Sequence, residues 1–330
     1  SGRFFLKWCR ETVWLFGRWK NKRLNCFLKN QKPDILYMHI FDSPYMYRLL
    51  FYIKKRTQAK IVLFTGDDNI SFPSFTPNIF KFSYRAVLTH MVKKAIKQSS
   101  LVICGSGKIL GCYQKKVEAN YLVLYKSGLL CPLKNLEKTV RKDSSFLFYG
   151  NLFPGRWQTL AKFALALDQF NVANGANHSL RIFTRDASNP KINSCFKKYR
   201  SVILQEQVDK ESLARIQNKS DFLVLAESFL PKDALLTEFS LSTKTADYLG
   251  SGIPILALGS IKNGTINYLS TNKAAILFTS EDQILTDLSN VLAENVAYFN
   301  AVVSRQRLLF SQHHDPDVVS KKFFSTLEGL

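Results

Sequence analysis

Short apolar runs alternate with longer helical patterns along most of this chain, and that alternation restricts the folds open to it. The expected strands form two series: Ile35–Ile40, Ile61–Thr65, Leu101–Cys104 and Tyr121–Tyr125, then Phe146–Tyr149, Leu180–Thr184, Val202–Leu204, Phe222–Ala226, Pro254–Leu258 and Ala274–Phe278. Helical patterns lie between most of them, for example over Thr159–Phe170, Lys210–Asn218 and Ser242–Ser251. Apolar strands separated by helices indicate parallel sheets covered on both faces. The sequence therefore predicts an α/β chain with two Rossmann-like domains that face a cleft.

A polar, basic connector over Lys134–Ser144 separates the two series. We therefore expect a first domain over residues 1–135 and a second domain from residue 136 onward. The first series has about four strands, whereas a complete doubly wound sheet often has six. The chain also starts with Ser-Gly and without Met, which is typical of a cleavage remnant. We expect the N-terminal domain to be truncated or incomplete, with native sequence upstream.

Positive charge is concentrated in the first part of the chain. The formal net charge of the 330 residues is +21, but residues 1–135 hold 24 Lys/Arg against 6 Asp/Glu, a balance of +18. Residues 136–330 hold 22 against 19, a balance of only +3. A basic half must face an anion, which leaves nucleic acid, an anionic membrane and a phosphate-bearing substrate as partners.

The segment "RFFLKWCRETVWLFGRWKNKR", residues 3–23, combines aromatic and basic residues. As a helix it places Arg3, Lys7, Arg10, Glu11 and Arg18 on one side, with Phe4, Phe5, Trp8, Leu15, Phe16 and Trp19 over most of the rest. Aromatic rings at headgroup depth and cations against anionic lipid are what an interfacial helix requires. A core helix with a basic outer face explains the pattern equally well, so both interpretations stay open.

Cysteine spacing and hydropathy exclude several classes of protein. No run of 18 or more uncharged apolar residues occurs, so we expect no membrane-spanning helix. The six cysteines lie far apart without a C-x-x-C pair. They fit reduced thiols in a cytosolic protein better than disulfides or a zinc site. The sequence therefore predicts no metal site.

The stretch "LSTKTADYLGSGIPILALGS", residues 241–260, is the most informative motif. Lys244 and Asp247 are one helical turn apart and share a face of the expected helix. The free N–H groups at a helix start form an anion site beside them. A ligand carrying phosphates and hydroxyls would use all of these groups, although a helix cap and a surface ion pair also explain them.

Together with "FLFYGNLFPGRWQTL" and "VILQEQVDKESLARIQNKSDFLVL", this stretch resembles the nucleotide-sugar-binding domain of family 4 type glycosyltransferases, which have the GT-B fold. "KPDILYMHIFDSP", "AKIVLFTGDDN" and "SSLVICGSGKILGCYQKK" are similar to their acceptor-domain strands. The resemblance covers roughly residues 30 to 330. It implies a nucleotide-sugar domain over residues 136–315 and a C-terminal helix, residues 316–330, that crosses back to the first domain.

The resemblance also implies roles for individual residues of the second domain. Arg156 and Lys244 would stabilise the leaving diphosphate, the electrostatic effect that usually dominates such catalysis, and Asp247 would accept the ribose hydroxyls. Gly150 and Asn151 would let the backbone approach the donor. Thr184, Arg185 and Val208 follow strands that end at the same crevice.

The sequence departs from the family pattern at its first acidic residue. The common pattern has two Glu residues separated by seven positions, whereas here Glu238 precedes Asp247 by nine. The intervening "FSLSTKTA" follows a Ser/Thr-Lys variant seen in bacterial surface-polysaccharide enzymes. The sugar contact is therefore expected from Glu238 or from the backbone around Leu241–Thr243, which includes Ser242 and Thr243.

Acceptor-side candidates follow strands of the first domain. The loop "TGDDN" places Asp67 or Asp68 where a carboxylate could orient the acceptor hydroxyl as a catalytic group, and an ordinary polar loop is an equal alternative. His39 ends a strand and Asp42 follows it. A buried structural histidine is as good an explanation of His39.

The leading hypothesis is a glycosyltransferase that moves a sugar from a UDP- or GDP-linked donor to a cell-envelope glycan or lipid-linked acceptor. The resemblance implies retention of anomeric configuration and no required metal or cofactor. We expect a cytoplasmic protein bound peripherally to the anionic inner face of the cell membrane. The alternatives are a GT-B sugar-nucleotide epimerase and a basic nucleic-acid-binding protein. The latter leaves the donor motifs unexplained, so we expect no nucleic-acid partner.

Overall fold

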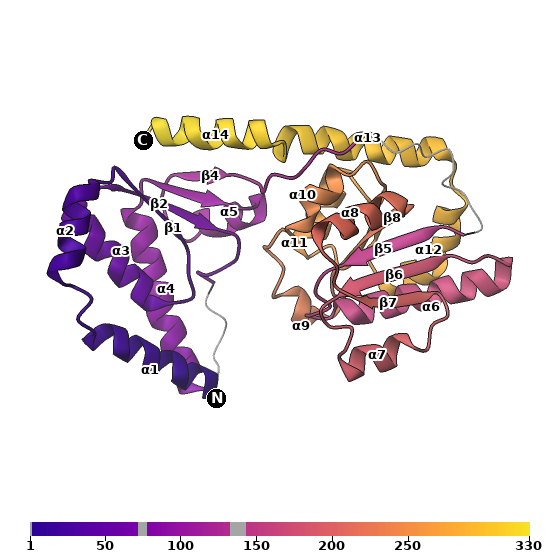
Figure 1. The fold of residues 1–330 in the computed structure, drawn as a ribbon, viewed down its shortest axis with the longest axis horizontal. Coiled ribbons are helices and arrows are strands. Elements are labelled where there is room, and N and C mark those ends of the chain that lie inside the picture. Colours follow the sequence, from indigo (N-terminus) through magenta and orange to yellow (C-terminus); the bar gives the residue numbers. More distant parts are fainter. Residues whose placement is uncertain (1, 72–77, 133–142) are drawn as a thin grey trace. The chain divides into compact units, whose positions relative to one another are not determined.

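The computed structural model describes residues 2–71, 78–132 and 143–330 (Figure 1). The chain forms two compact units: a first unit of Ser1–Tyr125 with Lys322–Leu330, and a second unit of Lys126–Lys321. Each unit holds one sheet of parallel strands. All ten expected strands are present, so the predicted α/β class with two Rossmann-like sheets is confirmed.

The first unit has a four-stranded sheet in the order β1-β2-β3-β4. Its strands are β1 (Ile35–His39), β2 (Lys60–Thr65), β3 (Leu101–Cys104) and β4 (Tyr121–Val123). Its helices are α1 (Gly2–Phe16), α2 (Lys22–Gln31), α3 (Pro44–Thr57), α4 (Ile79–Gln98) and α5 (Gly107–Gln114). Every residue of β3 is buried, as expected for a central strand covered on both faces.

The C-terminal residues complete this unit. Helix α14 (Pro316–Glu328) brings Phe323 and Leu327 onto the buried face formed by Val62, Leu101 and Ile103, and Leu330, which follows the helix, packs there too. The Phe323 ring meets Tyr37 edge-on at 6.2 Å between centroids. Lys322 Nζ donates to the carbonyl of Val123 at 3.0 Å. The last turns of the chain therefore cover a sheet that was built from its first 125 residues.

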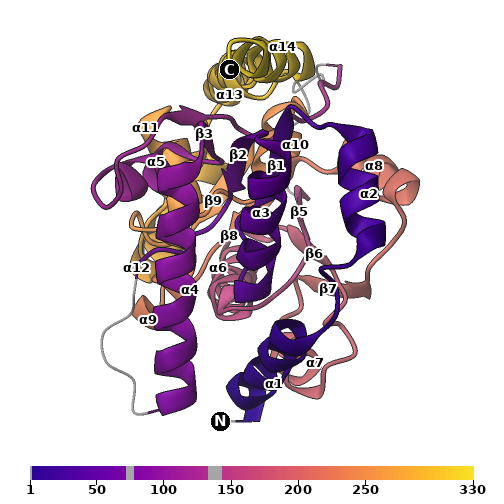
Figure 2. The same cartoon turned by 90° about the vertical axis from the view of Figure 1, so that its left-hand side faces the viewer.

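Helix α1 differs from the expected basic-and-aromatic helix over residues 3–23. It ends at Phe16, and α2 starts after Asn21, whose side chain caps the backbone N–H of Leu24. Helix α1 packs against α3 and α4 (Figure 2). The Trp8 ring lies edge-on to Tyr84, and Trp19 lies edge-on to Tyr52. Both tryptophans therefore pack against tyrosines of the same unit, as the core-helix interpretation expects.

Apolar side chains of α1 are also exposed, and Phe16 of the expected apolar side is one of them. Leu6, Val13 and Phe16 are exposed at 66%, 70% and 78%, spaced as on one helical face. Glu11, expected on the charged outer side, is buried and lies 3.2 Å from the Arg10 guanidinium and 3.6 Å from Arg48. The inner side of α1 is thus aromatic and carries the buried Glu11, and its outer side exposes both aliphatic and aromatic side chains.

The second unit has a six-stranded sheet in the order β10-β9-β8-β5-β6-β7. Its strands are β5 (Ser145–Tyr149), β6 (Ser179–Thr184), β7 (Val202–Glu206), β8 (Phe222–Ala226), β9 (Ile255–Leu258) and β10 (Ile276–Phe278). Strand β5 pairs with both β6 and β8. The strand order reverses at that point, and ligands of open α/β sheets bind at the carboxyl ends of the strands beside such a reversal.

Helices cover both faces of this sheet. They are α6 (Arg156–Asn174), α7 (Pro190–Phe196), α8 (Lys210–Lys219), α9 (Pro231–Ala234), α10 (Lys244–Leu249), α11 (Gly264–Thr271), α12 (Glu281–Leu292) and α13 (Val296–His313). One face packs under α6, where the buried Phe146 ring stacks on Phe222 at 4.8 Å and meets Phe163 edge-on. The other face packs under α10 and α13 through Tyr248 and Phe310.

The division between the units falls earlier than the sequence suggests. The backbone N–H of Gly128 donates to His314, and that of Cys131 donates to Gly250, so these residues pack on the second unit. The structure therefore divides after Tyr125 rather than at residue 135. Most of the expected connector Lys134–Ser144 lies outside the described residues, and its role as a linker stays a prediction.

Candidate functional site

The turn that follows β5 lies at the strand-order reversal of the second unit. Gly150 has φ +125° and Gly155 has φ +63°, conformations that favour glycine. The Gly150 N–H donates to the Phe183 carbonyl, and the Leu152 N–H donates to the Asp186 carboxylate at 3.0 Å. Asn151 is exposed within the same turn. Helix α6 begins directly afterwards with Arg156, so the fold directs that side chain to the carboxyl end of the sheet.

Arg156 forms a bidentate ion pair with Glu227, the residue that follows β8. Its Nε lies 3.2 Å from Glu227 Oε2, and its Nη2 lies 3.1 Å from both carboxylate oxygens. Its Nη1 donates to the Phe153 carbonyl at 3.0 Å. The Glu227 side chain is buried, whereas Arg156 keeps a small exposed fraction. This geometry fixes the plane of the guanidinium.

Lys244, the first residue of α10, points to the same place. A Cβ on Gly150 would lie 2.4 Å from Lys244 Nζ, so the ammonium occupies the space that this glycine leaves open. Nζ also lies 4.5 Å from the centre of the Phe148 ring. Burial and the charge of Arg156 lower the pKa of Lys244 from 10.5 to about 8, and Glu227 acts in the opposite direction. The structure thus brings Gly150, Arg156 and Lys244 together as the sequence predicts.

Asp247 lies on the following turn and is paired. Its Oδ2 accepts from Lys126 Nζ at 2.8 Å, and Lys126 also donates to the Thr243 carbonyl. Both partners of this ion pair are partly exposed, so a ribose hydroxyl could reach the carboxylate. The Lys126 carbonyl in turn accepts from Nδ1 of the buried His314 at 2.7 Å. Burial lowers the pKa of His314 to about 4, which keeps this ring neutral.

The ends of β6 and β7 place the remaining expected donor contacts. Arg185 is exposed, and its Nε donates to Gln207 Oε1 at 2.6 Å. The buried Thr184 hydroxyl contacts Asp186 at 3.3 Å, so it supports the turn after β5 through that carboxylate. Val208 packs on the apolar cluster beneath. Arg185 and Gln207 therefore offer polar groups beside an apolar floor.

The stretch before α10 shows a shorter helix than the sequence predicts. The expected helix Ser242–Ser251 is reduced to Lys244–Leu249. The Ser242 N–H donates to the Thr265 hydroxyl at 2.8 Å, and Thr243 is exposed. Glu238 lines a cavity of about 300 Å³ with Phe229, Leu235, Ser260 and Lys262, beyond the ends of β8 and β9. No contact that places Glu238 beside Arg156 occurs among the described residues.

The acceptor-side candidates belong to the first unit and are described by themselves. Asp68 Oδ1 accepts from the backbone N–H groups of Ile70 and Ser71, so this carboxylate closes a turn. The Asp67 side chain is exposed, while its carbonyl accepts from Thr65 and Tyr113. Of the two carboxylates, Asp67 is the better placed to meet a substrate.

His39 is the last residue of β1, the strand that pairs with β2, and Asp42 lies in the loop after β1. His39 is exposed and not buried, with its ring 4.6 Å from that of Phe64. Asp42 forms an ion pair with Lys7 of α1. Its carbonyl also accepts from the Tyr84 hydroxyl at 3.0 Å. Asp42 therefore serves to attach α1.

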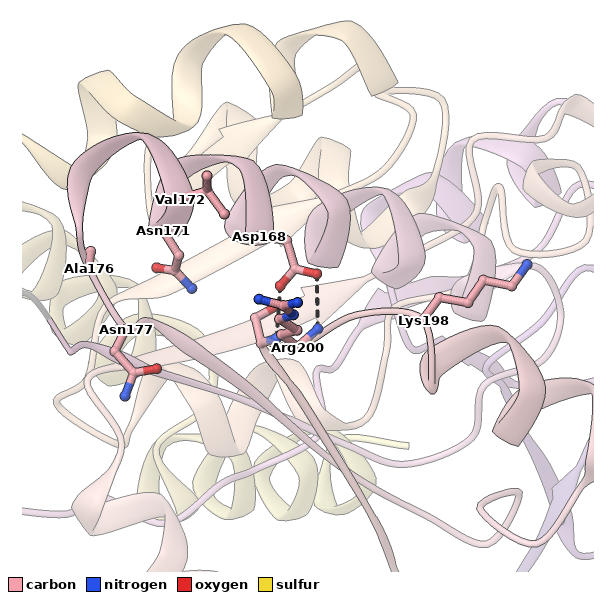
Figure 3. A pocket seen from close by; sticks show the side chains of 8 residues that line it. Asp168, Asn171, Val172, Ala176, Asn177, Lys198 and Arg200 are labelled. Carbon is pink, nitrogen blue, oxygen red and sulfur yellow. Dashed lines mark hydrogen bonds between the residues drawn. The ribbon is translucent and has the colours of Figure 1, made fainter.

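Another cavity of the second unit lies away from these residues. It has a volume of about 500 Å³ and is bordered by the end of α6 and the segments that precede β6 and β7. Figure 3 shows Asp168 pointing toward Arg200, and its carboxylate accepts from the backbone N–H groups of Arg200 and Ser201 at 2.9 and 2.8 Å. This is the amino end of the strands, opposite to the strand-order reversal. No expected site residue lines it.

Metal-binding and membrane-spanning features are not found in residues 2–71, 78–132 and 143–330. In these ranges no group of three or more His, Cys, Asp or Glu side chains is arranged to hold a metal ion. All six cysteines are free thiols. No helix in the same ranges has the length and apolarity of a transmembrane segment. The expectation that activity requires no metal or cofactor stays a prediction.

No protein-family model and no curated protein sequence matches this chain. Among solved structures, it is similar to an alpha,alpha-trehalose-phosphate synthase (UDP-forming) from Burkholderia xenovorans in complex with glucose-6-phosphate. The TM-score is 0.62 and the identity 11%, over 93% of this chain and 76% of that chain. An E. coli trehalose-6-phosphate protein bound with UDP-2-fluoro glucose matches with TM-score 0.62 and 14% identity, over 93% and 77%.

A third similar structure is a trehalose-6-phosphate synthase studied with bisubstrate glycomimetics for glycosyl transfer with retention. Its TM-score is 0.60 and its identity 13%, over 93% of this chain and 78% of that chain. The chain has the GT-B fold. At such identities the likeness shows the fold, and the finer assignment to the family 4 type stays a prediction.

Sequence reasoning missed two carboxylates of the site, Glu227 and Asp186. Both come just after buried strands, β8 and β6, where polar residues face the ligand crevice of an α/β sheet. Glu227 directly follows the uniformly apolar run Phe222–Ala226. Its position just after that run is the sequence feature that could have identified Glu227. Its partner Arg156 is 71 residues away, and only the fold brings them together.

Proposed function

We propose that this protein is a glycosyltransferase that binds a nucleotide sugar in its second unit. The observation that carries the proposal is the pair of cations, Arg156 and Lys244, held at the glycine turn beside the strand-order reversal. A partly desolvated lysine and a fixed guanidinium suit a diphosphate, which disperses its charge over several oxygens. The half-exposed Asp247 would accept the ribose hydroxyls, and Arg185 with Gln207 would meet the base.

In this proposal the two cations act mainly on the departing diphosphate. Bond cleavage at the sugar transfers negative charge to the leaving phosphate, and preorganised cations stabilise that charge without reorganisation. Lys244 at a pKa of about 8 is mostly protonated at neutral pH. It could therefore pair with the leaving oxygen or release a proton to it. Transfer with retention, the reaction studied with one of the similar synthases, would follow from attack on the face of the leaving group.

The acceptor we favour is a cell-envelope glycan or a lipid-linked sugar, with Asp67 orienting its hydroxyl. The Burkholderia xenovorans structure holds a ligand of a different kind, glucose-6-phosphate. A sugar phosphate is therefore the matched alternative in any acceptor screen. The rival epimerase would act on the nucleotide sugar alone. Product formation that depends strictly on added acceptor separates the two enzymes.

Nucleotide binding provides the first test. We expect UDP, and UDP-glucose as the donor probe, to raise the melting temperature of the protein, with GDP and CMP as comparisons. A ligand at 100 times its Kd stabilises the native state by about 2.7 kcal/mol. The shift should be lost in Arg156→Gln, which keeps the polar character of the side chain but not its charge. A protein that gives no shift with any of these nucleotides does not have the proposed site.

We further propose that the outer side of α1 binds an anionic membrane, which would bring the enzyme to a lipid-linked acceptor. Leu6, Val13 and Phe16 form its exposed aliphatic and aromatic face. Residues 2–32 hold nine Lys/Arg and one Asp/Glu, and that acid, Glu11, is buried. Apolar side chains beside a cationic run are the combination that favours the interface of an anionic bilayer.

Substitution of that face tests the membrane proposal. We expect Leu6→Ser, Val13→Ser and Phe16→Ser together to weaken binding to phosphatidylserine vesicles at high salt by on the order of 10- to 100-fold. Salt does not weaken the burial of apolar side chains. It does weaken charge attraction, which is screened over about 8 Å at physiological ionic strength. Vesicle sedimentation at low and high salt measures both parts. A matched control is Val172→Ser with Leu308→Ser, two exposed apolar residues of the second unit. Equal binding by both variants rejects α1 as the membrane contact.

A further inference from the structure

Glu227 is a buried carboxylate that lies beside two cations of the proposed donor site. It is 3% exposed and directly follows β8. Three contacts of 3.1 to 3.2 Å join it to Arg156. Its charge also acts on Lys244, whose pKa it raises while burial and Arg156 lower it. A buried carboxylate is normally retained only where charge partners compensate for its desolvation.

The backbone around Glu227 is anchored on two sides. Its N–H donates to the Leu258 carbonyl of β9 at 2.8 Å, and its carbonyl accepts from the Thr159 hydroxyl of α6 at 2.8 Å. The turn after β9 leaves no spare room, since a Cβ on Gly259 would lie 2.9 Å from Glu227 Cβ. Strand β9 and helix α6 therefore hold the Glu227 carboxylate in one direction. Its contact with Arg156 is a fixed feature of the unit.

The charge arrangement explains why a carboxylate is needed at this position. The charge of Arg156 lowers the pKa of Lys244, because like charges in a partly buried site repel. A bound diphosphate would offset that repulsion, but an empty site cannot. A fixed carboxylate supplies the missing negative charge before any ligand arrives. It also leaves Arg156 free to donate, since Nη1 carries two N–H groups and the Phe153 carbonyl takes only one.

We infer that Glu227 is a positioning residue of the donor site, which fixes the Arg156 guanidinium and keeps the Lys244 ammonium charged while no phosphate is bound. It acts through the two cations and does not itself contact the donor. The inference rests on the proposed function for the nature of the ligand. The electrostatic role can be measured without any ligand, so the two can fail separately.

The decisive measurement is the titration of Lys244 in the ligand-free protein. Lysines are reductively methylated with ¹³C, and the NMR signal of Lys244 is assigned by its loss in Lys244→Arg. We expect Glu227→Gln to move the pKa of Lys244 below about 8 and Arg156→Gln to move it upward. In the double variant the pKa of Lys244 should lie between those of the two single variants, since one substitution lowers this pKa and the other raises it. Glu281→Gln, which removes an exposed pair between Lys162 of α6 and α12, is the control and should change nothing.

The opposite directions of the two changes in the pKa of Lys244 distinguish this role from simple structural support. If either substitution merely loosened the site, water would enter and the pKa of Lys244 would rise toward 10.5 in both variants. An unchanged or raised value in Glu227→Gln therefore overturns the inference. Glu227→Asp gives a second measure, because it keeps the charge but shortens the reach to Arg156. We expect it to leave the pKa of Lys244 near 8 and to weaken UDP affinity at least tenfold; unchanged affinity would contradict the positioning role.

Wild-type nucleotide binding distinguishes failure of the inference from failure of the proposed function. If the titrations behave as expected but UDP and GDP do not bind, the donor assignment is wrong and the charge arrangement stands. If UDP binds but the titrations do not respond to Glu227, this carboxylate is a structural residue of an otherwise correct site. In an active enzyme, Glu227→Gln should also shift the alkaline limb of the pH–rate profile to lower pH.

Discussion

Lys244→Met is expected to lower turnover by 10²- to 10³-fold and at the same time to stabilise the protein. Removal of a preorganised charge that acts on the leaving group commonly reduces kcat by that factor. The gain in stability follows from the pKa of Lys244, lowered from 10.5 to about 8. The folded chain binds this proton less tightly than the unfolded chain does. Below pH 8 the charged lysine therefore costs the native state about 3 kcal/mol, and this cost disappears as the pH rises from 8 to 10.5.

The measurement combines steady-state kinetics with urea unfolding at several pH values. At pH 7 the variant should unfold at higher urea than the wild type. The difference should shrink toward pH 10.5, where the wild-type lysine is neutral in both states. Lys162→Met on α6 is the matched control, because its exposed pair with Glu281 contributes little to stability. Activity within threefold of the wild type, or a loss of stability at pH 7, would show that Lys244 is an ordinary surface cation.

A residue that reduces stability while serving chemistry is common at functional sites. Arg156 differs from Lys244 in this respect. Its charge is compensated by Glu227 through three contacts, whereas no described carboxylate lies within ion-pair distance of Lys244 Nζ. The anion that would compensate Lys244 most fully is a ligand. This difference is the physical reason to expect that Lys244 depends more strongly on a bound phosphate than Arg156 does.

The strands were predictable from sequence because their burial is uniform. Each β8 and β9 residue is buried, so the runs Phe222–Ala226 and Pro254–Leu258 are apolar without alternation. Strand ends were less predictable, since pairing partners determine them. Strand β4 stops at Val123, the partner of Cys104 at the end of β3. The backbone N–H of Ala274 bonds to Leu269 of α11, so this residue closes a helix instead of starting β10.

The inner and outer sides of α1 could not be assigned from sequence alone. Aromatic residues occur on more than one side of the helix, and their partners come from distant segments. Trp14 stacks on Tyr45 at 4.5 Å, and Trp8 contacts Tyr84. A helical wheel shows where rings and charges lie on the helix, but it does not show which distant tyrosines pack against them. The proximity of Gly150, Arg156 and Lys244 was more predictable, because all three lie in local motifs with characteristic spacing.

Gly150→Ala is expected to abolish measurable nucleotide binding and to destabilise the second unit. Alanine at φ +125° is strained by on the order of 1–3 kcal/mol. The new Cβ would also lie 2.4 Å from Lys244 Nζ and 2.6 Å from its Cε, so the lysine would have to leave its position. Strain reduces stability, whereas displacement of the ammonium removes a ligand contact. Urea unfolding and calorimetric titration with UDP measure the two effects separately.

Gly175→Ala is the matched control for the strain alone. Gly175 has φ +58° at the end of α6, and a Cβ there would meet nothing within 4 Å. We expect it to lose about 1 kcal/mol of stability and no affinity for UDP. Combining Gly150→Ala with Lys244→Ala removes both the collision and the cost of the buried charge, and leaves the backbone strain. This double variant should therefore be more stable than Gly150→Ala but bind UDP no better. Full UDP affinity in Gly150→Ala would mean that the ammonium of Lys244 does not need the space beside this glycine, and the donor site would have to be built from other residues.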